Sequence, residues 1–386
     1  MRFSILLLMS GILLLSACGA DEDNGFSFNR DVPPEAKTNG TISSVLELSP
    51  NLRTRYELVA GQGRACMYGA LQNSNVLSCW GRSIHPNDRE QVGGFVKGND
   101  NMLSIGEDHV CTTLVDSARR VHCDGSNEFG ENTDPDAIKR NNEIIEKHWL
   151  KNPSLVASGN RHNCALDEYG VYCWGSNSKG QTNVPSLTNP KWVAAGGDTS
   201  CAIDDDGKPE CLGDNSAGQT DIPDNVTFVT GLAVGSDFVC ASNVGSIECW
   251  GNTEDWDVQP TSVTEVVHLS AGGDHVCILD RTQDSPEIIV AECFGSDDST
   301  ASLLSVPEGI QSNIRSISAG YGFTCASNNY SGYEWYDDNK DSIYELEPQL
   351  GVLCWGNNEE NQASAPRQLC LGYHDEAIPL EARTCP

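Results

Sequence analysis

Basic residues are scarce in this chain of 386 residues. Lys and Arg number 24 against 55 Asp and Glu, which gives a formal net charge of −31 at pH 7. Binding nucleic acid requires a basic surface that neutralises phosphates, and anionic lipid headgroups likewise attract Lys and Arg. The composition therefore predicts no nucleic-acid partner and no docking on headgroups, and it indicates a solvated acidic surface.

Catalytic motifs are also missing. The sequence contains no Gly-x-Ser-x-Gly elbow, no His-Glu-x-x-His zinc motif and no phosphate-cradling glycine loop. Carboxylates are abundant, but pairing two of them as acid and base needs a spatial arrangement that the sequence does not supply. We therefore expect a protein that is not an enzyme and that requires no cofactor.

Long apolar runs are reduced to one, from Phe3 to Leu15, which follows the basic Arg2. Such a run is too short to span a bilayer as a stable helix. A short basic region, an apolar core and small residues before a break are typical of a secretory signal peptide. The sequence therefore predicts a signal peptide at 1–17.

The end of that run resembles a known processing motif. Leu15-Ser16-Ala17-Cys18 is similar to the lipobox of bacterial lipoproteins. The resemblance implies cleavage before Cys18 and attachment of acyl chains such as palmitate to this residue. The residue after this cysteine is Gly19 and not Asp, a pattern that resembles the one sorted to the outer membrane of the bacterial cell envelope. The alternative is an ordinary signal peptide in which Cys18 is incidental.

Cysteine is plentiful, with 17 residues in the chain. A protein kept reduced in the cytosol rarely carries so many without binding a metal. Sixteen remain when Cys18 is set aside, and they fall into consecutive pairs. In the first seven pairs, any residue and then Gly follow the second cysteine. The eight pairs are Cys66 with Cys79, Cys111 with Cys123, Cys164 with Cys173, Cys201 with Cys211, Cys240 with Cys249, Cys277 with Cys293, Cys325 with Cys354, and Cys370 with Cys385.

The cysteine pairs mark a repeat. The first cysteines of the seven pairs follow one another at intervals of 37 to 53 residues, which is typical of a repeat architecture. Near the second cysteine both alternating sets of residues are largely apolar, as in 171–175, so both faces of this strand should be buried. Radially arranged antiparallel meanders meet that demand. The sequence predicts an all-β fold, a seven-bladed β-propeller at 41–366, preceded by a flexible tether at 18–40.

Disulfides within each blade are the favoured interpretation of the pairs. Eight residues separate Cys164 from Cys173, which suits two facing strand positions joined by a turn. Facing residues lie about 4.5–5.5 Å apart between Cα atoms, within the disulfide range. Structural zinc is the alternative, but it usually takes cysteines about two to four residues apart. The eighth pair, Cys370 and Cys385, is expected to close a C-terminal tail at 367–386.

One segment departs from the strand pattern. An Asp-Pro pair at 134–135 is typical of a helix start. After it, Ile138, Ile145 and Trp149 share a stripe at roughly 3.6-residue spacing. The pattern predicts one small inserted helix at 136–150, packed on the propeller.

The repeat unit resembles a known family. The pattern Ala-Gly-Gly-x-x-x-Cys-Ala-Ile…Cys-x-Gly-x-Asn-x-x-Gly-Gln-Thr…Pro, best seen at 195–223, is similar to the regulator of chromosome condensation repeat. The Cys-paired bacterial variants also resemble the propeller-type β-lactamase inhibitor protein. The resemblance covers about 50–366 and implies the propeller fold and a binding role. The family's nuclear exchange-factor activity does not fit a secreted, acidic lipoprotein, and the fold hosts unrelated activities.

A position two residues before each first cysteine should form a ring in the propeller. Three of its seven residues are histidines, which leaves an axial metal site as an alternative. The other four are not ligands and one is an arginine, so hydrogen bonds within the local turns are the expected role. The seven residues are Arg64, His109, His162, Thr199, Phe238, His275 and Phe323.

The seventh pair encloses 28 residues, the longest insertion between paired cysteines of the repeat. The segment 327–350 should project from the hairpin end of the seventh blade, and loops on rigid scaffolds concentrate binding residues. Tyr and Trp dominate binding hot spots, so we expect its aromatic side chains to contact the partner. The alternative is that these rings fold back and cover the blade. They are Tyr330, Tyr333, Trp335, Tyr336 and Tyr344.

The same insertion carries a candidate calcium loop. Asp337, Asn339 and Asp341 alternate and Glu345 follows, and oxygen ligands at alternate positions are how loops wrap calcium. A full helix-loop-helix site is excluded because its glycine and its final glutamate are missing. A simple structural calcium site remains one hypothesis, and a solvated acidic tip is the other.

These patterns predict a monomeric, lipid-anchored envelope protein whose propeller is a scaffold for binding an unknown protein or glycan. Contact with the membrane would be through the lipid anchor only. One alternative is a propeller enzyme that acts on polysaccharide, a lyase or glycosidase, and another is a purely structural envelope protein. Sialidase-type Asp-box motifs would favour an enzyme, and the sequence has none.

Overall fold

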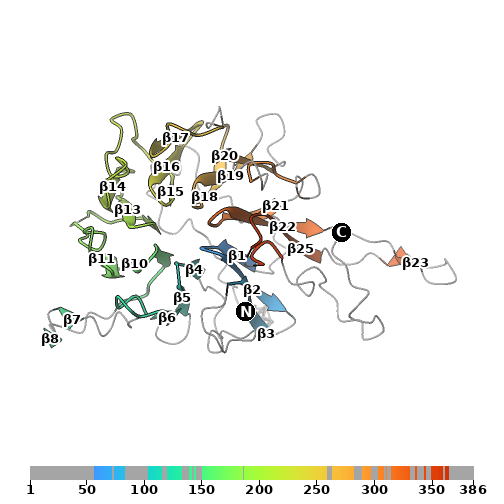
Figure 1. The fold of residues 1–386 in the computed structure, drawn as a ribbon, viewed down its shortest axis with the longest axis horizontal. Helices are drawn as coiled ribbons and strands as arrows, with labels where there is room; N and C mark the ends of the chain where they lie inside the picture. Colours follow the sequence, from blue (N-terminus) through green and yellow to red (C-terminus); the bar gives the residue numbers. More distant parts are fainter. Residues whose placement is uncertain are drawn as a thin grey trace, which may run out of the picture.

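Seven three-stranded sheets form the fold of the computed structural model. Figure 1 shows the sheets following one another around a ring, from the blue N-terminal sheet to the red C-terminal sheet, with the first and the last side by side. In each sheet the middle strand pairs antiparallel with one strand on either side. The chain is therefore an all-β, seven-bladed propeller, and the predicted fold class is confirmed.

The structure describes most of the propeller but not the ends of the chain. The predicted signal peptide (1–17), the tether (18–40), the acylation site Cys18 and the tail with Cys370 and Cys385 lie outside the described residues. The described residues are 56–71, 74–82, 103–114, 120–132, 139–140, 143–144, 150–185, 187–258, 263–281, 289–296, 303–307, 310, 314–330, 335–336, 343–344, 349–359 and 361–364.

Each blade is a meander of three strands in chain order, except that the seventh blade takes β25 as its third strand. The strands of the first three blades are β1 (Tyr56–Ala60), β2 (Arg64–Leu71), β3 (Ser74–Gly81), β4 (Leu103–Ile105), β5 (His109–Leu114), β6 (Arg120–Gly125), β9 (Leu155–Ser158), β10 (His162–Asp167) and β11 (Gly170–Gly175). Those of the other four are β12 (Trp192–Gly196), β13 (Thr199–Ile203), β14 (Pro209–Gly213), β15 (Gly231–Val234), β16 (Phe238–Asn243), β17 (Ser246–Gly251), β18 (Val266–Ala271), β19 (His275–Arg281), β20 (Ile289–Gly295), β21 (Ile314–Ala319), β22 (Phe323–Tyr330) and β25 (Gln349–Gly356).

Burial follows the position of a strand within its blade. Every residue of the middle strands β10 and β13 is buried, whereas the third strand β11 is mostly half-buried. A middle strand has a strand on either side and a blade on either face, so its residues have no route to solvent. The first strands of successive blades contact one another and line the axis of the ring.

The described hydrophobic core consists of seven clusters, and each lies between two adjacent blades. The cluster between the last and first blades includes Phe323 and Ala65. Polar contacts close the ring at the same interface: the Ala60 amide donates to Ser318 Oγ over 2.8 Å, and the Trp80 indole donates to the Gln362 carbonyl over 2.9 Å. The end of the repeat region therefore packs against the first blade.

The predicted helix at 136–150 is wrong. Two short strands, β7 (Lys139–Arg140) and β8 (Glu143–Ile144), pair antiparallel there. The two residues between them are asparagines, which favour tight turns and are poor in helix interiors, so turn chemistry outweighs the apolar stripe. No helix in the described part of the chain is long and apolar enough to cross a membrane.

Candidate functional site

Seven disulfides join directly opposed residues of the second and third strands of the seven blades. Their Cα atoms are 4.0–4.1 Å apart, and the register places each cysteine opposite its partner, as in Cys164 and Cys173. The prediction of disulfides within the blades is confirmed. Each blade is therefore covalently closed, and what surrounds the blades can vary without loss of their register.

The spacing of the bonded cysteines varies, although their opposition does not. The sequence separation ranges from 9 residues in the third and fifth blades to 29 in the seventh, so the length of the turn between the second and third strands accounts for the difference. The seven confirmed pairs are Cys66 with Cys79, Cys111 with Cys123, Cys164 with Cys173, Cys201 with Cys211, Cys240 with Cys249, Cys277 with Cys293, and Cys325 with Cys354.

The ring position before each first cysteine is the first residue of each middle strand, and all seven side chains there are buried. The histidines do not bond within their local turns as predicted. Each imidazole Nε2 instead reaches the next blade: His109 contacts Asn163 Oδ1 at 2.8 Å, His162 contacts Ser200 Oγ at 2.8 Å, and His275 contacts Thr324 Oγ1 at 2.7 Å. These contacts join adjacent blades at three of the seven interfaces.

The partners of two histidines fix the histidine tautomer. Ser200 Oγ donates its proton to the Gln181 carbonyl over 2.9 Å, so it accepts from His162 Nε2. Asn163 Oδ1 can only accept, so His109 Nε2 is a donor as well. Burial lowers the pKa of His162 to about 3 and that of His275 to about 4. All three described ring histidines are therefore neutral at pH 7, and within the described residues no group of His, Cys, Asp and Glu could hold a metal.

A Gln or Glu in the loop after a blade ties that loop to the next blade. The Gln181 side chain accepts from the Lys179 amide and Gln219 accepts from the Ala217 amide, both over 2.9 Å. The backbone carbonyl of Gln219 then accepts the Trp250 indole N–H over 3.0 Å. This explains why an aromatic residue follows the second cysteine in many repeats: the indole bonds to the loop of the preceding blade.

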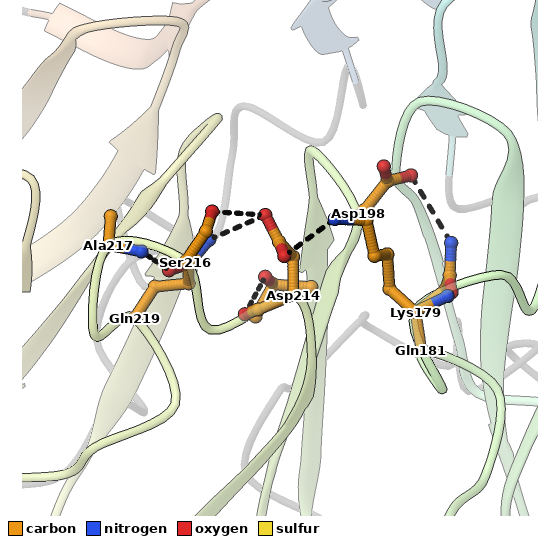
Figure 2. A network of polar contacts seen from close by, with 8 residues as sticks. Lys179, Gln181, Asp198, Asp214, Ser216, Ala217 and Gln219 are labelled. Carbon is orange, nitrogen blue, oxygen red and sulfur yellow. Dashed lines mark hydrogen bonds and ion pairs between the residues drawn. The ribbon is translucent and has the colours of Figure 1, made fainter.

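The loops that follow the blades also carry ion pairs, and Figure 2 shows the network that joins the third and fourth blades. Lys179 Nζ lies 3.0 Å from Asp214 Oδ1, and Gln181 Nε2 donates to Asp198 Oδ1 over 3.2 Å. A hydrogen bond from Ser216 and the nearby Lys179 hold the pKa of Asp214 below its usual value. Because these groups bond to one another across an interface, the network stabilises the ring.

We call the side of the ring that carries the turns between first and second strands the turn face. On the fifth and sixth blades the acidic groups of this face are less balanced by basic groups. There, burial and the neighbouring Asp237 raise the pKa of Asp274. The ring of Tyr321 is exposed nearby, and burial and these two carboxylates raise its pKa. The turn face is therefore an acidic surface.

The predicted recognition insertion lies at the opposite side, between β22 and β25 of the seventh blade. It contains a further hairpin, β23 (Trp335–Tyr336) and β24 (Ile343–Tyr344), in which Trp335 and Tyr344 are directly opposed. Figure 1 draws β23 outside the ring of blades. The structure thus brings two of the five predicted contact residues together in register.

The other predicted residues of the insertion are placed as follows. Tyr330 is the last residue of β22, and Tyr336 lies in β23. Tyr333 and the four candidate calcium ligands lie outside the described residues; these ligands are Asp337, Asn339, Asp341 and Glu345. The hairpin itself was missed from the sequence, although aromatic and β-branched residues on both sides of a polar run are typical of one.

Comparisons with known proteins agree with this architecture. Residues 154–181, which comprise the third blade and its loop, match the model of the regulator of chromosome condensation (RCC1) repeat. The ectodomain of the receptor kinase CR4 from Physcomitrella patens is similar in structure, with a TM-score of 0.53, 21% identity, and coverage of 79% of this chain and 74% of that one. The ectodomain of the Arabidopsis thaliana receptor kinase ACR4 has a TM-score of 0.52 at 19% identity, covering 78% and 95%. At these identities the likeness shows the propeller fold.

Proposed function

We propose that this protein is a lipid-anchored binding scaffold of the bacterial cell envelope, without catalysis, that captures a protein or glycan. The hairpin inserted between β22 and β25 carries the proposal, because a propeller blade is complete without it. A rigid, disulfide-closed blade presents the hairpin, which lowers the entropy lost when a partner orders it. The register places Trp335 opposite Tyr344, and Trp and Tyr are residue types that offer large contact area from few rotatable bonds.

Removing the insertion tests this function. Replacing residues 331–348 by a short Asn-Gly turn should leave the thermal transition of the propeller nearly unchanged, since β22 and β25 still pair through Cys325 and Cys354. Capture from envelope extract on the immobilised mature chain, quantified by mass spectrometry, and binding on a glycan array should both fall to background.

A matched deletion controls for the loss of any loop. Residues 282–288 lie between β19 and β20 in the sixth blade, at the same end of their blade as the insertion of the seventh. Shortening that segment should leave capture intact. Capture of a partner by the variant that lacks 331–348 would contradict the assignment of recognition to this hairpin. Equal losses of capture in the two deletion variants would contradict the specificity of the hairpin's role.

The proposed anchor has a separate test. The lipobox implies acyl chains on Cys18, and two or more chains hold a protein on a membrane where one chain barely does. Cys18→Ser should move the protein from the membrane fraction to the soluble fraction and remove the mass of the acyl chains. Membrane retention at unchanged mass would contradict lipid anchoring, and capture by the soluble variant would show that binding does not depend on the anchor.

A further inference from the structure

The histidine contacts occur at three interfaces for a reason visible in the repeat. Where a ring residue is His, the next blade offers a polar side chain immediately before its first cysteine: Asn163, Ser200 or Thr324. At the other four interfaces that position is apolar, and the ring residue is not histidine. Those four pairs are Arg64 with Val110, Thr199 with Val239, Phe238 with Val276, and Phe323 with Ala65.

The third blade, β9 to β11, is the described blade that has such a contact on both sides. Asn163 in its middle strand receives His109 of the second blade, and its own His162 reaches Ser200 of the fourth. Each contact continues into a carbonyl: Asn163 Nδ2 donates to the Glu131 carbonyl over 2.8 Å, and Ser200 Oγ donates to the Gln181 carbonyl over 2.9 Å. Two hydrogen-bonded chains therefore hold this blade to its neighbours.

Both chains need a neutral imidazole. With Nε2 donating, Nδ1 carries a lone pair, and the Nδ1 atoms of His109 and His162 are buried with no hydrogen-bond partner. A proton placed there would be a buried charge with no acceptor, which is costly. The charged groups facing His109 are Glu107, Asp108 and Glu131, which oppose the loss of a proton, whereas His162 faces only His109.

We propose that the third blade is an acid-sensitive gate in the propeller, released from the second and fourth blades by mild acid while the fourth, fifth and sixth blades stay joined to one another. Its Cys164–Cys173 disulfide keeps the blade itself intact on release. The fourth, fifth and sixth blades meet through apolar clusters, one with Val239 and the other with Phe238 and Val276, so no imidazole titrates between them. Release would expose the faces of the neighbouring blades that are otherwise buried.

The direction of the pH dependence follows from the two states. Burial lowers the pKa of His162 to about 3 in the closed ring, whereas a solvated histidine in the open ring has a pKa of about 6.5. The closed state is therefore fully favoured above pH 6.5 and loses stability as the pH falls from 6.5 toward the pKa of the closed state. His162 alone favours opening about tenfold per pH unit in this range, or about 30-fold at pH 5, and the lowered pKa of His109 acts in the same direction.

Hydrogen exchange of the full mature chain, corrected for the intrinsic pH dependence of exchange, measures this opening. Between pH 7 and pH 5 the amides of β9 to β11 should lose at least about 30-fold in protection, and those of β15 to β17 in the fifth blade less than about threefold. The variant His109→Gln with His162→Gln keeps an N–H donor to Asn163 and Ser200 but does not titrate. It should abolish the excess loss in the third blade.

Two further measurements keep the test decisive. His275→Gln, at the interface of the sixth and seventh blades, is the matched control and should leave the third blade as acid-sensitive as in the native chain. If the double variant does not fold, the NMR titration of His162 in the native protein serves instead, and it should show the Nε2–H tautomer down to pH 5. Equal loss of protection in the third and fifth blades, or a His162 that titrates near pH 6.5 in the closed ring, would overturn the proposal.

Discussion

Reduction of the seven blade disulfides should unfold the propeller at neutral pH without any denaturant. The loops that they close run from 9 to 29 residues in sequence separation, and in the chain-entropy model each contributes roughly 3 kcal/mol. Seven such bonds contribute roughly 20 kcal/mol to the free energy of unfolding. Most folded proteins have a total free energy of unfolding of only about 5–15 kcal/mol. The blades need these bonds because their strands are short and their cores are divided among seven interfaces.

The measurement is the near-ultraviolet circular dichroism of the indoles during a titration with reductant. Trp174 and Trp250 are buried and hydrogen-bonded to the preceding loops, so their signal should vanish together with the thermal transition. A variant with only Cys201 and Cys211 replaced by alanine is the control and should remain folded, with unfolding free energy lowered by about 3 kcal/mol. A fully reduced chain that keeps its native spectrum would refute the disulfides as the main source of stability.

The disulfide register was predictable because it depends on local spacing. Cys240 and Cys249 are separated by nine positions, and only a two-stranded hairpin brings such residues into opposition at each of seven sites. The number of blades followed from counting these pairs. Sequence patterns of this kind report contacts within one repeat, where the interacting residues are near in the chain.

Contacts between blades were not predictable in the same way. His162 and Ser200 are 38 residues apart and His109 and Asn163 are 54 apart, and the length of each insertion changes the separation. Aligning the repeats on their first cysteines would have shown that a polar residue in one repeat accompanies a histidine in the one before. The helix at 136–150 is wrong for a different reason: the periodic apolar stripe favours a helix, but the two asparagines between β7 and β8 favour a turn.

Substituting Gly197 by alanine should be among the most damaging single changes in the ring. Gly197 lies in the turn between β12 and β13, where a Cβ would meet the backbone carbonyl oxygen of Ser236 in the fifth blade at 2.0 Å. Neither turn can move without breaking a hydrogen bond. The Gly197 carbonyl accepts from the Asn160 amide over 2.8 Å, and the Ser236 amide donates to the Gly273 carbonyl over 3.2 Å. These bonds link the turns of successive blades, so moving one turn disturbs its neighbours.

The matched control is Gly245→Ala. Both glycines have positive φ, 48° for Gly197 and 78° for Gly245, so alanine suffers left-handed strain of about 1–2 kcal/mol at either position. Nothing lies within 4 Å of a Cβ at Gly245, so that variant should lose this amount alone. Gly197→Ala should lose at least about 4 kcal/mol and about 10 °C in Tm, measured by urea and thermal unfolding. Equal losses in the two variants would mean that backbone strain, and not the close approach of the fourth and fifth blades, sets the requirement for glycine at Gly197.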